Sequence, residues 1–398
     1  MLLTTCLRFV SPQISFSFRF LPKTTPFSAS LSCNNRSQSA RVAALCHLLK
    51  QPPLTIGSHQ LLLSFGGTFA METNSPCTLV LCGKSSTETE IAKSLKENSI
   101  IKLPDGHEVS VLLQSEMVMP VKQDSFNAKL FINSLSTEQF GRFLIWSPRL
   151  TSTHDAVSHN FCELPVGAVC VADSQFKGRG RSKNAWESPK GCLMFSFTVQ
   201  MEEGRIVPLL QYVVSLAVTE AIKDVCNING LPFLDVKIKW PNDLYLNGLK
   251  VGGILSTSTY KANKFNISVG IGLNIDNDEP TTCLNAVLRD LVSSSVQLKK
   301  EDIAAAFFNK FERFYNLFIH QGFKSLEELY YRTWLHSGQR IIIQEKNEDE
   351  IVENVVTIQG LTSSGYLLAI GDDSQLCELH PDGNSFDFLK GLVRRKLE

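Results

Sequence analysis

The first 71 residues contain no Asp or Glu, and the first acidic residue is Glu72. The composition of the chain therefore changes at this point. Charged residues in this Ser- and Thr-rich segment are all basic: Arg8, Arg19, Lys23, Arg36, Arg41 and Lys50. A basic, Ser-rich and acid-poor N-terminus is typical of an organelle transit peptide. We therefore interpret residues 1–70 as a disordered transit peptide for the chloroplast, the mitochondrion or both; a plain disordered tail is the alternative. Met71 stands at the border, and initiation there would give a cytosolic form.

The composition of the whole chain argues against several classes of protein. Acidic and basic residues number 39 each in 398 residues, so no net positive charge favours DNA or RNA. The 11 cysteines form no CxxC pair, so we expect free thiols and no metal site. No run of about 18 apolar residues occurs, so we expect no membrane span.

The hydrophobic pattern predicts an α+β fold in three parts. A strand, a helix and a strand within residues 72–140 predict a small N-terminal α/β extension. Within 141–336 the pattern predicts a mixed sheet backed by helices. Its strands are expected at 167–173, 191–199, 234–240 and 266–275, and its main helices at 208–225 and 301–321. Short strands broken by Gly, Asp and Asn within 338–398 predict a small β-barrel.

The first candidate site is the stretch GRGR at 178–181, which follows a predicted strand. Arg presents planar donors that match the oxygens of carboxylates and phosphates, and Gly lets the backbone approach a ligand closely. Trp186 supplies an aromatic lid five residues further on. The pattern favours an anion-binding loop; a solvated basic loop, or an RNA contact through GRGRSK, is the alternative.

Three further segments have the character of a site. KWPND at 239–243 ends an alternating strand, which puts Lys239 on the polar face beside an amide and a carboxylate. A lysine in this position is well placed to meet a phosphate, and a surface lysine before a turn is the alternative. KVGGIL at 250–255 and GIGLN at 270–274 each carry two glycines, which indicate close approach of the backbone to a ligand.

Together, and in this order, the four segments resemble the biotin–protein ligase family, called holocarboxylase synthetases in eukaryotes. The resemblance extends over roughly residues 145 to 398. It implies a class II synthetase-like catalytic domain at 141–336 and an SH3-like barrel at 338–398. No helix-turn-helix pattern precedes them, so the DNA-binding module of repressor-type members is not expected.

The resemblance also implies roles for individual residues. The biotin-binding residues would be Ser152, Thr153, His154, Gln175, Arg179, Gly180, Arg181 and Lys239. The nucleotide-binding residues would be Trp186, Asn242, Asp243, Gly253 and Asn274. Lys239, Arg179 and Arg181 are the candidates for charge stabilisation in catalysis. His154 stands where many members have Asn.

The activity that the resemblance implies is a two-step ligation. Biotin, ATP and Mg²⁺ give biotinyl-5'-AMP, and the biotinyl group then passes to a lysine of biotin carboxyl carrier domains. The expected acceptors are carboxylases of the acetyl-CoA and methylcrotonoyl-CoA types. We expect no tightly bound prosthetic group, no DNA and no membrane partner. A homodimer is one possible assembly. A lipoate-type ligase, a nucleic-acid-binding regulator and a catalytically inactive biotin sensor are the alternatives.

A reporter experiment tests the interpretation of the N-terminus. Residues 1–71 fused to a fluorescent protein should direct it into an organelle, with plastids favoured over mitochondria. A protein that starts at Met71 should stay in the cytosol and remain active, because every motif lies beyond that residue. Microscopy of both fusions checks this, and a wholly cytosolic reporter carrying residues 1–71 would contradict it.

Overall fold

A computed structural model describes residues 9–11, 14–16 and 76–398, apart from 118–123, 182–183, 278, 293–295, 348–349, 382–383, 388–389 and 396–398. The chain divides into two units, Met1–Met71 and Glu72–Glu398. In the first unit, β1 (Phe9–Ser11) pairs antiparallel with β2 (Ile14–Phe16). These six residues depart from the expected disorder, and the rest of the predicted transit peptide lies outside the described residues.

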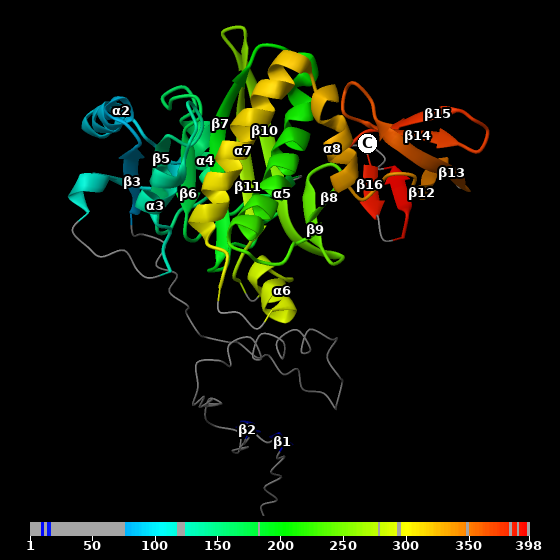
Figure 1. The fold of residues 1–398 in the computed structure, drawn as a ribbon, viewed down its shortest axis with the longest axis horizontal. Helices are drawn as coiled ribbons and strands as arrows, with labels where there is room; N and C mark the ends of the chain where they lie inside the picture. Colours follow the sequence, from blue (N-terminus) through cyan, green and yellow to red (C-terminus); the bar gives the residue numbers. More distant parts are fainter. Residues whose placement is uncertain are drawn as a thin grey trace, which may run out of the picture. The chain divides into compact units, whose positions relative to one another are not determined.

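A nine-stranded mixed sheet organises the second unit (Figure 1). Its order is β4-β3-β5-β6-β7-β11-β10-β9-β8, and only the pairs β3–β4 and β5–β6 are parallel. The strands are β3 (Cys77–Gly83), β4 (Val109–Leu113), β5 (Phe143–Ser147), β6 (Val169–Ala172), β7 (Cys192–Met201), β8 (Lys237–Lys239), β9 (Asp243–Leu246), β10 (Leu249–Lys261) and β11 (Lys264–Asn274). The predicted mixed sheet is confirmed.

The expected boundary after residue 140 does not separate two structures. Strands β3 and β4 were predicted to form a small extension of their own, but β3 pairs with β5 of the catalytic region. Hydrogen bonding therefore makes the described part of 72–140 the outer end of the main sheet. The sequence pattern could not show this, because strand partners far apart in the chain leave no local signal.

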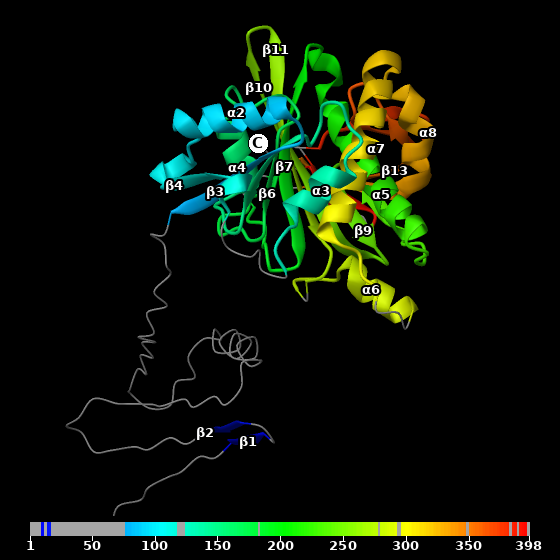
Figure 2. The same ribbon diagram turned by 60° about the vertical axis from the view of Figure 1, so that its left-hand side comes forward.

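Helices cover both faces of the sheet (Figure 2). The large core on one face includes α3 (Ala128–Ser134), α5 (Leu210–Ile228) and α7 (Lys300–Gln321). The core on the other face includes α2 (Ser86–Glu97) and α4 (Thr153–His159). Successive side chains of β3 point to opposite faces of the sheet, so Val80 belongs to the first core and its neighbours Leu79 and Leu81 belong to the second. Shorter elements are the 3₁₀ turns at Pro104–Gly106, Gln114–Glu116 and Gly204–Leu209, and helix α6 (Leu284–Leu291).

Two long helices supply most of the helical side of the core. On α7 the predicted apolar stripe is buried against the sheet: Ile303, Phe307, Phe311, Phe314 and Phe318. The phenyl rings of Phe307 and Phe311 pack on Phe197 of β7 with centroids 5.7 and 5.1 Å away. Helix α5 and the turn before it, Gly204–Ile228, are apolar and long enough to cross a membrane, but 67% of their most apolar stretch is buried in the protein.

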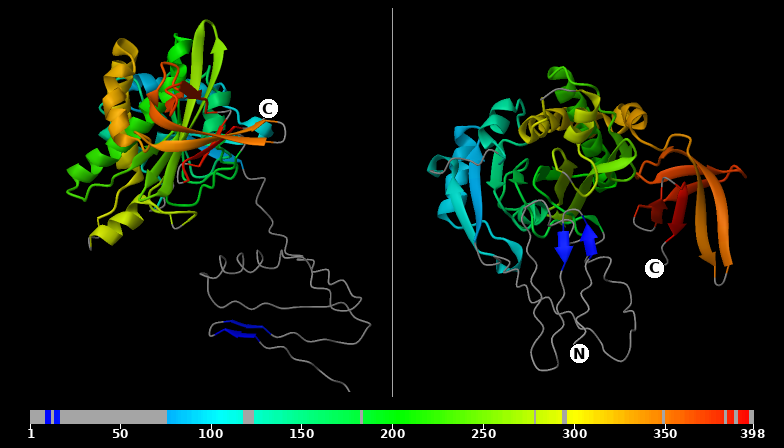
Figure 3. Two further views of the ribbon diagram at one scale, coloured as in Figure 1. Left: turned by 90° about the vertical axis from the view of Figure 1, so that its right-hand side faces the viewer. Right: turned by 90° about the horizontal axis from the view of Figure 1, so that it is seen from below.

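After α8 (Lys324–Thr333) the chain forms a six-stranded sheet beside β8, at the end opposite β4 (Figures 1 and 3). The order is β15-β14-β13-β12-β17-β16. The strands are β12 (Arg340–Asn347), β13 (Glu350–Leu361), β14 (Leu367–Gly371), β15 (Leu376–Leu379), β16 (Asn384–Asp387) and β17 (Leu392–Arg395). The predicted all-β part is confirmed. Among the described residues the sheet is open, because β15 and β16 at its two edges do not pair with each other. Its buried side chains join the large core of the catalytic sheet, so the two sheets share one interior.

Candidate active site

A pocket of about 570 Å³ opens where α4, the loop at 175–187, and strands β7 to β11 meet. Every residue that the sequence predicted as a site residue lines this pocket. They are Ser152, Thr153, His154, Gln175, Arg179, Gly180, Arg181, Trp186, Lys239, Asn242, Asp243, Gly253 and Asn274. The fold therefore brings the four motif segments together with residues 152–154 and Gln175, while the role of each residue stays a prediction.

One end of the pocket is a recess of buried, uncharged polar groups at the start of α4. Ser152 caps this helix, and its hydroxyl accepts from the Asp155 amide at 3.3 Å. The backbone N–H of Thr153 donates to Gln175 Oε1 at 2.7 Å, and its hydroxyl lies 2.9 Å from Ser196 Oγ. Such a recess offers donors and acceptors at fixed positions to a neutral polar ligand group.

His154 completes this recess as a neutral side chain. Its Nε2 lies 2.9 Å from Thr257 Oγ1, and its buried Nδ1 has no hydrogen-bond partner among the described residues. A Cβ on Gly270 would lie 3.1 Å from that Nδ1, so glycine leaves room beside it. Burial, with the positive charge of Arg179 adding to it, lowers the pKa of His154 to about 4.

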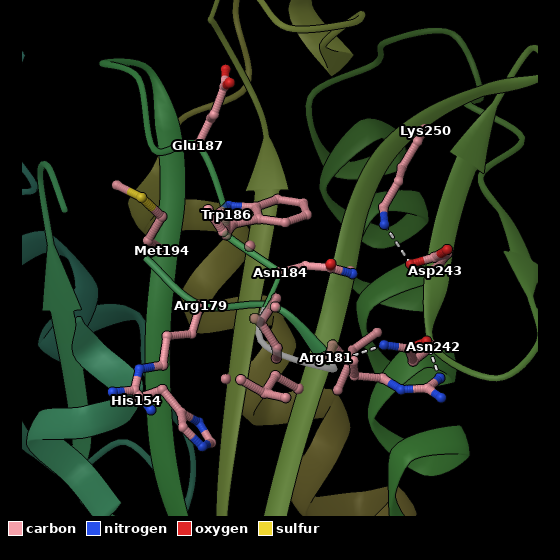
Figure 4. A pocket seen from close by; sticks show the side chains of 18 of the residues that line it. His154, Arg179, Arg181, Asn184, Trp186, Glu187, Met194, Asn242, Asp243 and Lys250 are labelled. Atoms are coloured by element: carbon pink, nitrogen blue, oxygen red, sulfur yellow. Dashed lines mark hydrogen bonds and ion pairs between the residues drawn. The ribbon is translucent and has the colours of Figure 1, made fainter. Parts of the chain in front are cut away.

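Protein groups hold both arginines of the GRGR loop, and Figure 4 shows the contact of Arg181 with Asn242. Arg179 Nε lies 2.9 Å from the Asp155 carboxylate. Arg181 donates to Asn242 Oδ1 at 2.9 Å and to the Pro381 carbonyl at 3.1 Å. One guanidinium thus joins the loop to the KWPND turn and to the C-terminal sheet.

The KWPND turn contains a cis peptide bond between Trp240 and Pro241 and is anchored on three sides. The Trp240 backbone N–H donates to His336 Nε2 at 3.0 Å, and its indole N–H donates to the Tyr212 hydroxyl at 2.8 Å. That hydroxyl in turn donates to the Gly365 carbonyl of the C-terminal sheet. The turn is therefore fixed by α5, by the segment after α8 and by the C-terminal sheet.

Positive charge gathers where the turn meets β10. Lys239 Nζ lies 3.8 Å from Asp243 Oδ2. Lys250 Nζ lies 2.6 Å from Asp243 Oδ1 (Figure 4). Burial lowers the pKa of Lys239; Asp243 opposes this shift and Lys250 adds to it. With Arg179 and Arg181, four cations line the pocket against the carboxylates of Asp155, Asp243 and Glu187. The arrangement suits an anionic ligand.

The remaining wall carries an aromatic ring and an amide. A Cβ on Gly272 would lie 2.6 Å from the Trp186 indole, so the missing side chain makes room for the ring. Asn274 donates to Thr281 Oγ1 at 3.2 Å and to the Thr282 carbonyl at 3.0 Å. No group of three or more His, Cys, Asp or Glu side chains that could hold a metal ion occurs in the described part of the chain.

Comparison with known proteins agrees with this geometry. The model of the Biotin/lipoate A/B protein ligase family matches residues 146–274, and that of the Biotin protein ligase C terminal domain matches 336–391. The chain is 70% identical to the Arabidopsis thaliana protein named Biotin--protein ligase 1, chloroplastic, over 85% of this chain and 93% of that protein. It is also 70% identical to Biotin--protein ligase 2 of the same plant, over 82% of this chain and 100% of that protein.

The chain belongs to the biotin–protein ligase family. Among solved structures it is similar to the biotin protein ligase from Aquifex aeolicus in complex with biotin and ATP, with 23% identity and a TM-score of 0.48 over 65% of this chain and 100% of that one. The first family match spans the GRGR, KWPND, KVGGIL and GIGLN segments, and the second spans strands β12 to β16 of the C-terminal sheet.

Several residues that line the pocket or hold its side chains were not predicted as site residues. Lys250 belongs to a recognised motif, but only the fold shows that it pairs with Asp243. Asp155 and Pro381 hold the two arginines, and Ser196 holds Thr153. Asp155, two positions after Thr153, could have been predicted as a partner for an arginine of the site. The contacts of Pro381 and Ser196 depend on how distant parts of the chain pack, so the sequence gives no local signal for them.

The buried histidine behind the turn generates a pH prediction. Burial and the charge of Lys239 lower the pKa of His336 to about 4, against an ordinary 6.5, while its hydrogen bond to Gln339 opposes the shift. The folded state therefore favours neutral His336, a stabilisation that is present above pH 6.5 and lost as the pH falls towards 4. Between pH 7 and 5 this one group should cost about 2 kcal/mol of unfolding free energy.

The measurement is urea denaturation of wild type and His336→Gln at pH 7 and pH 5. Gln retains an acceptor for the Trp240 N–H but does not titrate, so the variant should lose less stability over this interval. The exposed His159→Gln variant is the control and should follow wild type. Equal pH dependence in wild type and His336→Gln would contradict the assignment.

Proposed function

We propose that this chain activates biotin with ATP and joins it to a lysine of biotin-carrier proteins. The observation that carries the proposal is a single pocket with three matched regions. A neutral polar recess suits the ureido ring of biotin, a cationic centre suits its carboxylate and the α-phosphate, and Trp186 with Asn274 suits the adenosine group. The names of the two Arabidopsis relatives that are 70% identical to this chain support the same activity. A lipoate-type ligase or a nucleic-acid-binding regulator is not favoured by these relatives.

In the first step the biotin carboxylate attacks the α-phosphorus of ATP, the bond to diphosphate breaks, and biotinyl-5'-AMP forms. Two anions must approach each other, so catalysis depends on positioning and on fixed positive charge. Lys239, Arg179 and Arg181 lie around this centre and would supply that charge. We assign Mg²⁺ to the polyphosphate of ATP, since Mg²⁺ is commonly held mainly by phosphate oxygens and water.

In the second step the amine of an acceptor lysine attacks the biotinyl carbonyl, and AMP leaves. The mixed anhydride also reacts with water, so a loop that covers it protects the intermediate. Residues 178–181 and 184–186 are placed to do this, because Arg181 bridges the loop to Asn242 and to the C-terminal sheet. We propose carrier domains of acetyl-CoA and methylcrotonoyl-CoA carboxylases as acceptors, and the chloroplast as the destination of the longer form. The name of one relative, which includes the word chloroplastic, supports the latter.

The test of the activity uses purified protein, labelled biotin, ATP and a carrier domain. Wild type should transfer label to the carrier lysine and catalyse biotin-dependent exchange of labelled diphosphate into ATP. Lys239→Ala should reduce the exchange rate by about 10² to 10³-fold, the effect of deleting a charge-stabilising donor. Lys237→Ala, on the same strand but outside the pocket, is the matched control. Absence of transfer by wild type would refute the function, and near-normal exchange by Lys239→Ala would remove that residue from the mechanism.

Arg181→Gly tests the covering loop. The variant should still form the adenylate, because Lys239 and Arg179 remain, but it should release more of it. Released biotinyl-AMP acylates exposed lysines, so biotin should appear on serum albumin added beside the carrier domain. If the variant makes adenylate but labels albumin no more than wild type, the loop does not retain the intermediate.

A further inference from the structure

Lys250 is a cation of the pocket to which neither the motif nor the proposed steps assign a task. It lies on β10 at the pocket wall, with its side chain 36% exposed against 16% for Lys239. Its ammonium lies 2.6 Å from Asp243 Oδ1, and Figure 4 shows the two side chains pointing toward each other. The pair is thus part of the site rather than of the outer surface.

A β-bulge explains why the motif reads Lys-x-Gly-Gly. The register of β10 on β9 shifts between Lys250 and Gly252, so Gly252 lies opposite the core residue Leu244 and Gly253 lies opposite Asp243. In an unbroken strand Lys250 and Gly252 would share a face. The bulge instead puts Lys250 and Gly253 on the pocket side, three positions apart.

The second glycine leaves space for the ion pair. A Cβ on Gly253 would lie 3.5 Å from Asp243 Oδ1 and 3.7 Å from Lys250 Cε, so the pair lies directly over the bare backbone. The Thr281 hydroxyl donates to the Lys250 carbonyl at 2.6 Å and fixes the strand at this point. Backbone and neighbours therefore set the position of the Lys250 ammonium.

The two lysines compete for one carboxylate. Asp243 Oδ2 lies 3.8 Å from Lys239, whereas Oδ1 lies 2.6 Å from Lys250. Coulomb attraction falls with distance, so the carboxylate is bound more strongly to Lys250. A carboxylate that moved fully onto Lys239 would neutralise the charge that the proposed first step needs.

We propose that Lys250 is a positioning residue for adenylate formation, which holds the Asp243 carboxylate back from Lys239 and so leaves the Lys239 charge available to the reacting anions. The proposal rests on the proposed function. Without Lys250, Asp243 closes on Lys239 and the pocket loses the effect of two cations rather than one.

The experiment compares Lys250 variants, alone and combined with Asp243→Asn, by biotin-dependent exchange of diphosphate into ATP. Lys250→Met removes the charge and keeps the length of the side chain, and it should lower kcat for exchange by about tenfold or more. Lys250→Arg keeps the ion pair and should stay near wild type. Asp243→Asn combined with Lys250→Met should exchange faster than Lys250→Met alone, because the Asp243 carboxylate no longer neutralises Lys239.

The outcomes separate this proposal from others. A double variant no faster than Lys250→Met, or a Lys250→Met variant at the wild-type rate, overturns it. A loss of folding would lower all variants together in thermal melts, and Asp243→Asn would not restore activity in that case. If wild type and Lys250→Arg exchange normally while the rescue fails, only this inference falls. If wild type itself does not exchange, the proposed function falls.

Discussion

The site depends on how Trp240 is held. Its backbone N–H and its indole N–H each find a buried acceptor, on His336 and on Tyr212. Burying either group without a partner costs about 1–3 kcal/mol, so both acceptors stabilise the turn. The indole N–H also lies 3.4 Å from the Gly365 carbonyl, a longer contact than the 2.8 Å to Tyr212. This anchoring directs residues 239–243 toward the pocket. Because the Tyr212 hydroxyl also bonds to the Gly365 carbonyl, the C-terminal sheet takes part in building the site.

The charges of the pocket are held in place by the protein itself. Asp155 holds Arg179, Asp243 holds Lys250, and Asn242 with the Pro381 carbonyl holds Arg181. Cations fixed in this way need little rearrangement when negative charge develops, which is the basis of electrostatic catalysis. In the proposed function, the same contacts would make the loop responsive to a ligand, since an anion that replaced them would change how the loop is held.

Sequence reasoning identified what is local and missed what depends on strand pairing. GRGR, KWPND and GIGLN are contiguous, so their chemistry and their turns could be read directly, and the aromatic stripe of α7 followed from helical spacing. The pairing of β3 with β5 and the ion pair of Lys250 with Asp243 could not be predicted. The first needs a partner more than fifty residues away, and the second needs a bulge that the residue pattern does not specify.

One hydroxyl group tests whether anchoring of the turn creates the site. Tyr212→Phe deletes the nearer of the two acceptors of the Trp240 indole N–H, and the donor to Gly365, while it keeps the ring in the core. The measurement is amide hydrogen exchange of residues 239–246, followed by mass spectrometry, in wild type and in this variant. We predict faster exchange in this segment of the variant and unchanged exchange in α7, which lies elsewhere in the core. Identical protection of residues 239–246 in the two proteins would contradict the account.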